Sequence, residues 1–273
     1  KPWFGCACCP SNVSRFIPSL PGYVYAVKDN QVYVNLYLSN KAELIVNKKK
    51  VVLEQETGYP WNGDIRVKVA QGNQEFALKL RIPGWVRNEV LPSGLYSYAD
   101  NQKPTYRIIV NGQETANTLN NGYLSIERKW KKGDVVKIHF DMLPRIVKAN
   151  EKVVDDKGRV SVERGPIVYC AEWPDNKCNV HTVLLNQHPQ FKVVEKPELL
   201  YGISQLKTDA QALSYDKNGK LITKDTELTL IPYYAWAHRG EGDMKVWLPI
   251  DVSAASALPQ EVQKWEDNGF FKN

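Results

Sequence analysis

Three cysteines stand close together near the start of the chain, in the string GCACCP at residues 5–10, and their type and spacing are well suited to chemistry. The 273-residue chain has only two more, Cys170 and Cys178. Thiolates are nucleophiles, and they bind Zn²⁺ in tetrahedral sites at about 2.3 Å. A disulfide between the adjacent Cys8 and Cys9 would strain the peptide that joins them, whereas both sulfurs can reach one soft cation. The cluster predicts either a zinc site or a group of small buried apolar residues.

The ligand count leaves this zinc site incomplete. A structural zinc site needs four donors, and no Cys-x-x-Cys motif or histidine lies near the cluster at metal-ligand spacing. The histidines stand singly at 139, 181, 188 and 238, in the region that reads as sheet, and are expected to be structural or surface residues. Cys170 and Cys178 flank a predicted turn, and we favour free thiols there over a disulfide across a hairpin.

Other catalytic patterns are missing from the sequence. It has no nucleophile elbow for a Ser-His-Asp triad, no glycine-rich phosphate loop and no Walker motif. The string HRGEGD at residues 238–243 follows the aromatic segment PYYAWA. We interpret it as a turn, with a binding loop as the alternative.

Composition and charge exclude several classes of protein. The net charge of +6 comes from 36 basic and 30 acidic residues that are mostly interspersed, so no nucleic-acid partner is expected. No apolar run approaches the roughly 20 residues that span a bilayer, and no membrane segment is predicted. The sequence has neither an initiator Met nor a leader pattern, and we expect a mature or truncated chain.

Alternating apolar and polar residues dominate the chain from about residue 23 onwards, which predicts half-buried β-strands. One such face carries Phe76, Leu78, Leu80 and Ile82, and others carry Val32, Val34, Leu36 and Leu38, then Val136, Ile138 and Phe140, then Met244, Val246, Leu248 and Ile250. Asn111-Gly112 and Asn121-Gly122 are typical hairpin turns. Strands with one apolar face must bury it against a second sheet, so we predict an all-β chain of two consecutive antiparallel, jelly-roll-like β-sandwich domains.

The elements outside this pattern set the expected boundaries. Ser11 or Asn12 is expected to cap one short helix, with Val13, Phe16 and Ile17 at helical spacing and a break at Pro18. Alternation is lost again between residues 142 and 166, and we place the boundary between the sandwiches near residue 148, within about ten residues.

Longer strings taken together resemble a known family. CCPSN, YPWNGDIRVKV, LRIPGWV, NGYLSIERKWKKGDVVKIHF, VSVERGPIVYCAEW and LIPYYAWAHRGEGDMKVWLP follow one another in this order. They are similar to the C-terminal half of the bacterial β-L-arabinofuranosidases of glycoside hydrolase families 127 and 146. The resemblance covers nearly the whole chain.

This resemblance implies a domain layout. Family members carry the active site on an N-terminal (α/α)₆ barrel, which two β-sandwich domains follow. Residues 1–22 are then expected to be a short helical remnant at the C-terminal end of that barrel, with residues 23–148 as the first sandwich and residues 149–273 as the second. The upstream barrel of the same protein is an expected partner, and a homodimer is a candidate assembly.

The resemblance also implies roles for the cysteines. Cys8 matches the family's zinc-bound nucleophile, Cys9 matches a second zinc ligand, and Cys6 matches a nearby cysteine that is not a ligand. The family's other ligands, a glutamate and a cysteine, and its glutamate acid/base lie upstream of this chain. Zn²⁺ is therefore the expected cofactor, and arabinose-containing plant glycans are the expected substrates. Enzymes of this kind are often periplasmic or extracellular, which gives an expectation of export from the family alone.

Three functions follow as hypotheses. The first is the C-terminal portion of a retaining glycoside hydrolase with a cysteine thiolate nucleophile, in which the sandwiches support the barrel and this fragment alone is inactive. The second is a non-catalytic carbohydrate-binding or structural module, in which exposed aromatic residues such as Trp236 or Trp247 stack on sugar rings. The third is a scaffold that zinc holds together without catalysis.

Overall fold

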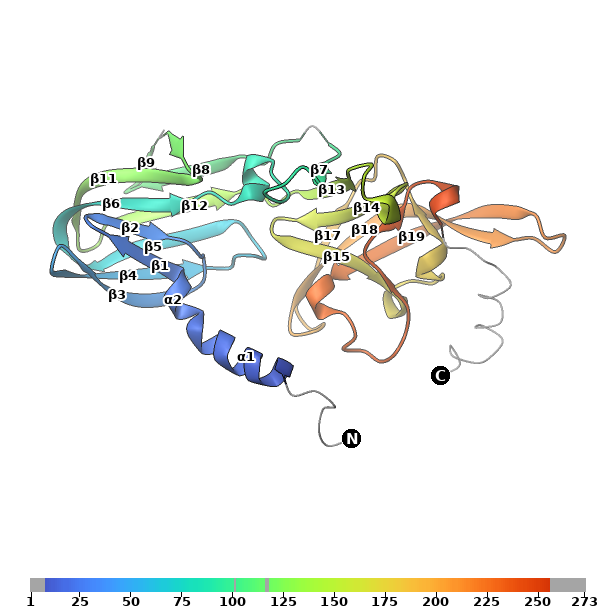
Figure 1. Ribbon diagram of the computed structural model, residues 1–273, viewed down its shortest axis with the longest axis horizontal. Helices are drawn as coiled ribbons and strands as arrows, with labels where there is room; N and C mark the ends of the chain where they lie inside the picture. Colours follow the sequence, from blue (N-terminus) through green and yellow to red (C-terminus); the bar gives the residue numbers. More distant parts are fainter. Residues whose placement is uncertain (1–7, 101, 116–117, 256–273) are drawn as a thin grey trace. The chain divides into compact units, whose positions relative to one another are not determined.

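β-Strands make up most of the regular structure in the computed structural model, which describes residues 8–100, 102–115 and 118–255 (Figure 1). Two helices come first, α1 (Cys8–Ser19) and α2 (Pro21–Val24). The chain divides into two units. The first comprises the described residues up to Arg87 together with Pro104–Asp141, and the second comprises Asn88–Lys103 and the described residues from Met142 onwards. The fold is all-β, as the alternating pattern predicts.

Two sheets build the first unit. The five-stranded sheet has the order β1 (Tyr25–Lys28), β2 (Gln31–Val34), β6 (Asn73–Arg81), β11 (Tyr123–Lys131) and β10 (Leu119–Asn120). The six-stranded sheet has the order β3 (Asn40–Val46), β4 (Lys49–Thr57), β5 (Asp64–Gln71), β12 (Val135–Phe140), β8 (Tyr106–Val110) and β9 (Gln113–Glu114). All neighbours are antiparallel except β2 and β6, which are parallel.

The period-two pattern correctly identifies the buried faces of the longer strands. All four predicted positions from Phe76 to Ile82 are at most 1% exposed, and Val136, Ile138 and Phe140 are at most 2% exposed. Each sheet therefore turns one apolar face inward, which defines a sandwich. Asn111 and Gly112, and likewise Asn121 and Gly122, have the positive φ angles that these predicted turns require.

The second unit is a ten-stranded, hydrogen-bonded network. Its path is β16 (Val183–Leu185), β18 (Ile203–Tyr215), β19 (Leu221–Pro232), β15 (Ile167–Glu172), β14 (Arg159–Arg164), β13 (Pro144–Ala149) and β7 (Tyr96–Tyr98). Three strands branch from it, with β17 (Lys192–Lys196) on β18, β20 (Met244–Lys245) on β15 and β21 (Leu248–Pro249) on β14. β18 and β19 form a long hairpin that pairs from Leu206 opposite Leu230 to Tyr215 opposite Leu221.

A segment from the middle of the chain belongs to the second unit. Residues 88–103 leave the first unit after the 3₁₀ helix η1 (Gly84–Arg87) and contribute β7, which pairs with β13. Arg145 of β13 holds the segment, because its Nη2 donates to Asp100 Oδ1 at 2.9 Å and to Asn88 Oδ1 at 2.7 Å. Its guanidinium carbon also lies 3.4 Å from the ring centroid of Tyr98. A buried cation thus receives both a counter-charge and an aromatic face.

The division between the units falls between Asp141 and Met142, which lies within the ten-residue margin of the boundary predicted near residue 148, although a cut at residue 148 itself would divide β13. The units differ from the predicted segments in one respect, because the prediction contains no insertion of residues 88–103. In β13 the charged Arg145 and Lys148 flank the adjacent Ile146 and Val147, and Arg145 shares the buried face with Val147, so the strand shows no apolar alternation that could reveal it.

Local differences have physical causes as well. β2 ends at Val34, so the predicted apolar face fails beyond it: Leu38 is 41% exposed, while Tyr37 is 6% exposed and donates its hydroxyl to the Arg81 carbonyl at 2.7 Å. Helix α1 begins at Cys8, so Ser11 lies inside it and donates to the Cys8 carbonyl instead of capping. Residues 244–250 form β20 and β21 instead of one strand, because they pair with different neighbours. Among the described residues, no helix has the length and apolar character to cross a membrane.

Candidate functional site

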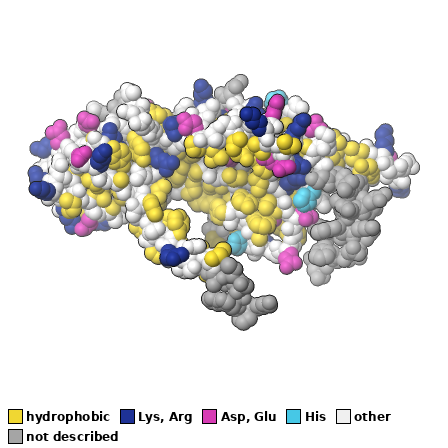
Figure 2. Space-filling view, viewed as in Figure 1, with side chains coloured by type: hydrophobic (Ala, Val, Ile, Leu, Met, Phe, Trp, Pro, Cys, Tyr) yellow, Lys and Arg dark blue, Asp and Glu magenta, His cyan; other side chains and the backbone are white. Residues whose placement is uncertain are grey.

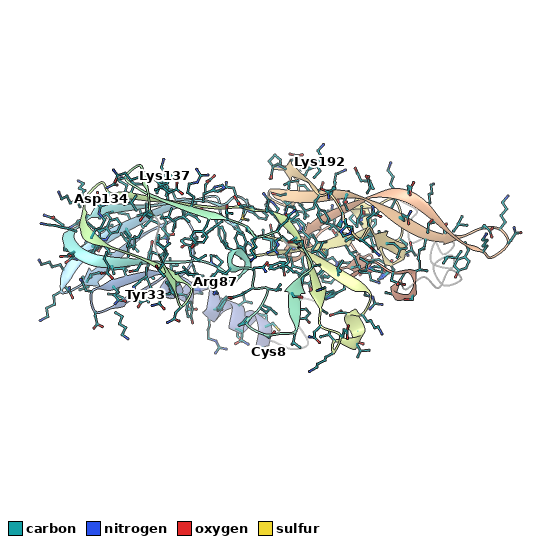
Figure 3. All side chains as sticks on the ribbon, turned by 90° about the horizontal axis from the view of Figure 1, so that it is seen from above. Cys8, Tyr33, Arg87, Asp134, Lys137 and Lys192 are labelled. Carbon is teal, nitrogen blue, oxygen red and sulfur yellow. The ribbon has the colours of Figure 1, made fainter. Side chains whose placement is uncertain are left out.

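Cys8 and Cys9 occupy the first turn of α1, and both are exposed (Figure 3). Their Sγ atoms lie 3.7 Å apart, which is far longer than the roughly 2.05 Å of a disulfide. Within α1 the Ser14 hydroxyl donates to the Pro10 carbonyl at 2.8 Å. Cys6 lies outside the described residues.

The sulfur separation fits two donors of one zinc ion. Two thiolates bound at about 2.3 Å to a tetrahedral centre lie about 3.8 Å apart, which is close to the separation of the Cys8 and Cys9 sulfurs. In the part of the chain that the structure describes, no group of three or more His, Cys, Asp or Glu side chains gathers in a metal-binding arrangement. The pair therefore fits adjacent corners of a tetrahedron and leaves two corners for other donors.

Helix α1 carries these thiols without burying any of its own residues. Val13, Phe16 and Ile17 are 52–58% exposed, and Tyr23 of α2 is 56% exposed. Hydrophobic side chains are visible along α1 in the space-filling view (Figure 2). Exposed apolar side chains gathered on one helix mark a surface that contacts another molecule. The helical spacing predicted from the sequence is therefore real, but nothing in the described chain covers it.

The single histidines lie beside carboxylates or on the surface. His139 Nδ1 is 2.7 Å from Asp64 Oδ1, and His181 Nε2 is 3.5 Å from Asp243 Oδ1. His188 and His238 are exposed. These positions agree with the expectation of structural or surface histidines, and none of the four joins Cys8 in a metal-binding group within the described residues.

Cys170 and Cys178 form no disulfide, which confirms the prediction of free thiols. Cys170 is fully buried, and burial raises its pKa to about 12. Burial also raises the pKa of Cys178, while a weak contact with Thr226 opposes the shift. Both thiols therefore stay protonated at neutral pH, which makes them poor nucleophiles in contrast to a metal-bound cysteine.

The loop at residues 238–243 is held in place by a cluster of charged side chains. Arg239 Nη1 donates to Asp175 Oδ1 at 2.8 Å, and its Nη2 pairs with both Glu172 and Asp175. The side chains of the two carboxylates are only 1% and 8% exposed. Gly242 lies so close to the indole of Trp173 that a Cβ there would fall 2.0 Å from the ring. Arg239 and the close approach of Gly242 to Trp173 thus hold the predicted turn against the second unit. Sequence analysis missed its partners, which lie more than 60 residues away.

The two tryptophans considered for sugar binding have different surroundings. Trp247 stacks on Tyr96 of β7, with 5.6 Å between the ring centroids. Trp236 is 38% exposed and lies parallel to Tyr233 with an angle of 8° between the rings. Trp236 is therefore exposed, whereas Trp247 is half-buried.

A hollow of about 650 Å³ lies against four strands of the six-stranded sheet, β4, β5, β8 and β12. Its lining includes Glu56 and Arg66, which form an ion pair at 2.8 Å, and His139 with its partner Asp64. Paired charges across strands are typical of a solvated sheet face. No sequence pattern could have shown this hollow, because its residues come from separate strands.

The architecture and the thiol pair define a class of protein: β-sandwich units attached to a helix that exposes two adjacent cysteines. Residues 31–142 match the family description "Beta-L-arabinofuranosidase, GH127 middle domain", and residues 144–249 match "Glycoside hydrolase family 127 C-terminal domain". The chain belongs to glycoside hydrolase family 127, as the part that carries its middle and C-terminal domains.

Similar proteins support this membership. The chain is 30% identical over 265 residues to the non-reducing end β-L-arabinofuranosidase of Bifidobacterium longum subsp. longum, a match that covers 90% of this chain and 37% of that enzyme. A solved GH127 β-arabinofuranosidase structure is 80% identical with a TM-score of 0.92, over 94% of this chain and 40% of the other. A GH127 β-L-arabinofuranosidase from Geobacillus stearothermophilus T6 is 33% identical with a TM-score of 0.79, over 90% and 38%. The chain therefore spans about two fifths of the length of these relatives.

Proposed function

We propose that the complete protein is a retaining β-L-arabinofuranosidase that acts on arabinose-containing plant glycans and that uses Cys8 as its nucleophile. The single observation that carries this proposal is the Cys8–Cys9 pair. Both thiols are exposed on one helical turn, and their sulfurs are 3.7 Å apart, in a chain of family 127. Its relatives described above are named as arabinofuranosidases.

Cys8 and Cys9 are the residues of this chain that would hold zinc. The metal, when bound, supplies a positive charge that keeps thiols deprotonated at neutral pH. Because the two residues are neighbours on one turn, the backbone of α1 places their Cβ atoms and their side-chain rotamers bring the two sulfurs to 3.7 Å. Cys9 thereby holds the site in place while the Cys8 sulfur faces the substrate. The other donors, a glutamate and a cysteine, are expected from the polypeptide that precedes this chain in the family.

The chemical step forms and breaks one bond at the anomeric carbon. A lone pair of the Cys8 thiolate attacks that carbon, the bond to the leaving-group oxygen breaks with its electron pair, and a carboxylic acid from the upstream domain protonates this oxygen. Water then attacks the thioglycosyl carbon from the opposite side, the same carboxylate takes its proton, and the Cys8 thiolate leaves. Two inversions give retention of configuration.

The sandwich units are proposed to support the catalytic domain. α1 is the proposed end of the helical barrel, since Phe16, Ile17 and Val13 are all more than half exposed. Burial of such side chains contributes about 1.5–3 kcal/mol each. The helix would thus both complete the catalytic domain and connect it to the strands that start at Tyr25.

The test replaces single sulfurs in the complete protein. Cys8→Ser should lower the rate of arabinoside hydrolysis by at least about 10³-fold while the fold persists, because the weaker oxygen nucleophile replaces the thiolate. Cys9→Ser should lower both the zinc content, measured by mass spectrometry, and the activity. Cys178→Ser is the matched control, because Cys178 lies in the second unit, and it should leave both values unchanged.

Each alternative function gives a different result. A zinc-stapled scaffold predicts that Cys8→Ser lowers the unfolding temperature without a specific loss of turnover. Hydrolysis at an undiminished rate by Cys8→Ser would refute the assignment of Cys8 as the nucleophile.

A further inference from the structure

The second unit exposes three aromatic side chains on one short stretch of backbone. Tyr233 and Tyr234 are 45% and 58% exposed, and Trp236 is 38% exposed. The 3₁₀ helix η5 (Tyr233–Ala235) carries the first two, and the Trp236 amide donates to the Tyr233 carbonyl at 3.1 Å. We call Tyr233, Tyr234 and Trp236 the aromatic surface. Large aromatic residues dominate the energetics of interfaces, so three of them together at the surface require an explanation.

The backbone beneath the aromatic surface is firmly anchored. Ala235 is 3% exposed and belongs to a core cluster with Cys170 and Ile231. The amide of Ala237, a residue with a φ of +67°, donates to Glu172 Oε1 at 3.0 Å. Arg239 then fixes the following turn, as described above. The surface is therefore presented in a fixed geometry, which lowers the entropy cost of binding a partner.

The anchoring itself is costly for the fold. Burial of two carboxylates and a guanidinium carries a desolvation penalty that their attraction only partly offsets. A positive φ at an alanine adds backbone strain. Such features persist where they hold a functional geometry, and the element that they hold here is the stretch that carries the aromatic surface.

The shape of this region favours a protein partner over a sugar. Small-molecule sites are concave and combine apolar walls with converging polar groups. A hollow of about 410 Å³ lies beside the same loop, lined by residues that include Trp173, Lys177 and Asp243, but none of the three aromatic residues lines it. They form a surface outside that hollow, which is the form of an interface core rich in Tyr and Trp.

The identity of the partner follows from the layout of the family. The chain carries a middle and a C-terminal domain and spans 37–40% of the length of its relatives, so about three fifths of a complete protein lies outside it. We propose that the aromatic surface packs against the catalytic domain of the same protein and so attaches the second unit to it directly. This deepens the proposed function, because it rests on the presence of that domain. It is independent of the roles of Cys8 and zinc.

Hydroxyl-radical footprinting with mass spectrometry tests the proposal. The modification rates of Tyr233, Tyr234 and Trp236 are measured in the complete protein and in the 273-residue chain. The rate of each residue in the complete protein is compared with the rate of the same residue in the 273-residue chain, so that differences in intrinsic reactivity cancel. Tyr215 is the matched control, because it lies in the same unit and is 40% exposed. Rates at the aromatic surface should be about fivefold or more lower in the complete protein, because an interface core excludes water, whereas the rate at Tyr215 should not change.

Three results would overturn the proposal. Equal rates in the two proteins would show that the catalytic domain does not cover the surface. Low modification rates of these three residues already in the 273-residue chain would show that another part of this chain covers the aromatic surface. Protection that appears only after arabinan is added would identify a sugar-binding platform instead. None of these results depends on hydrolysis, so they remain distinct from a failure of the Cys8 assignment.

Discussion

Replacement of Arg239 by Met should destabilise the second unit strongly. The arginine pairs with both Glu172 and Asp175, and its removal leaves two carboxylates that are 1% and 8% exposed. The Ala237 amide at 3.0 Å and the Gln205 amide at 3.2 Å donate to these carboxylates as well, but neither donor carries a charge that could replace the guanidinium. Loss of one partner from a buried ion pair costs about 3–5 kcal/mol.

Thermal unfolding, followed by circular dichroism, measures the stability that Arg239→Met loses. For a unit of this size each kcal/mol lowers the unfolding temperature by about 2–4 °C, so Arg239→Met should lower it by about 6–20 °C. Glu172→Gln and Asp175→Asn, combined with Arg239→Met, should restore part of the stability, because the triple variant leaves no buried charge.

The matched control is an exposed ion pair in the same unit. Lys207 and Glu227 lie 2.5 Å apart, with 31% and 58% of their side chains exposed. Lys207→Ala should cost no more than about 1 kcal/mol. If Arg239→Met proves no more costly than Lys207→Ala, the anchoring ascribed to Arg239, and with it the rigidity of the aromatic surface, is wrong.

Two further predictions concern thiols and pH. Iodoacetamide at pH 8.5 should modify the exposed Cys8 and Cys9 in the 273-residue chain well before Cys170, because burial raises the pKa of Cys170 to about 12; peptide mapping that finds Cys170 modified first would contradict its burial. Burial also raises the pKa of Glu163 above its ordinary value, although a hydrogen bond from Tyr98 partly opposes the shift. The folded state then binds this proton more tightly than the unfolded state, so Glu163 stabilises the fold most at low pH, and its contribution is lost as pH rises from the unfolded pKa through the raised native pKa. Urea titrations between pH 4 and 8 should show a smaller decline in stability with pH for Glu163→Gln than for the parent, and an unchanged decline would contradict the shift.

Local patterns predicted much of the first unit. β6 and β12 alternate between apolar and polar residues apart from Ala77 and Val135, and the predicted apolar positions in both strands are buried. The Asn-Gly turns also follow from local chemistry, because these residues tolerate positive φ. Such features depend on neighbours in the sequence, and a single chain carries enough information to find them.

Long-range pairing explains what the sequence did not show. β7 has three residues and no clear alternation, so nothing local indicates that residues 88–103 pair with β13 in the second unit. Arg239 likewise looks like part of a flexible glycine-rich turn until its carboxylate partners 64 and 67 residues away are known. The role of Cys8 came only from the family resemblance, since two adjacent thiols without further donors leave the function open.

The thiol pair and the aromatic surface share one physical property, which connects the two proposals. In each case a short stretch of this chain brings the groups together, one turn of α1 for the sulfurs and η5 with the turn held by Arg239 for the rings, and the proposed binding partner is the catalytic domain. A zinc ion held by Cys8 and Cys9 together with two upstream donors would couple metal binding to the docking of α1. The second unit, attached through its own aromatic surface, would then limit the motion of the sandwich units relative to the catalytic domain. Removal of zinc should therefore loosen the contact at α1 but leave the protection of Trp236 intact, because the two contacts use separate parts of the chain.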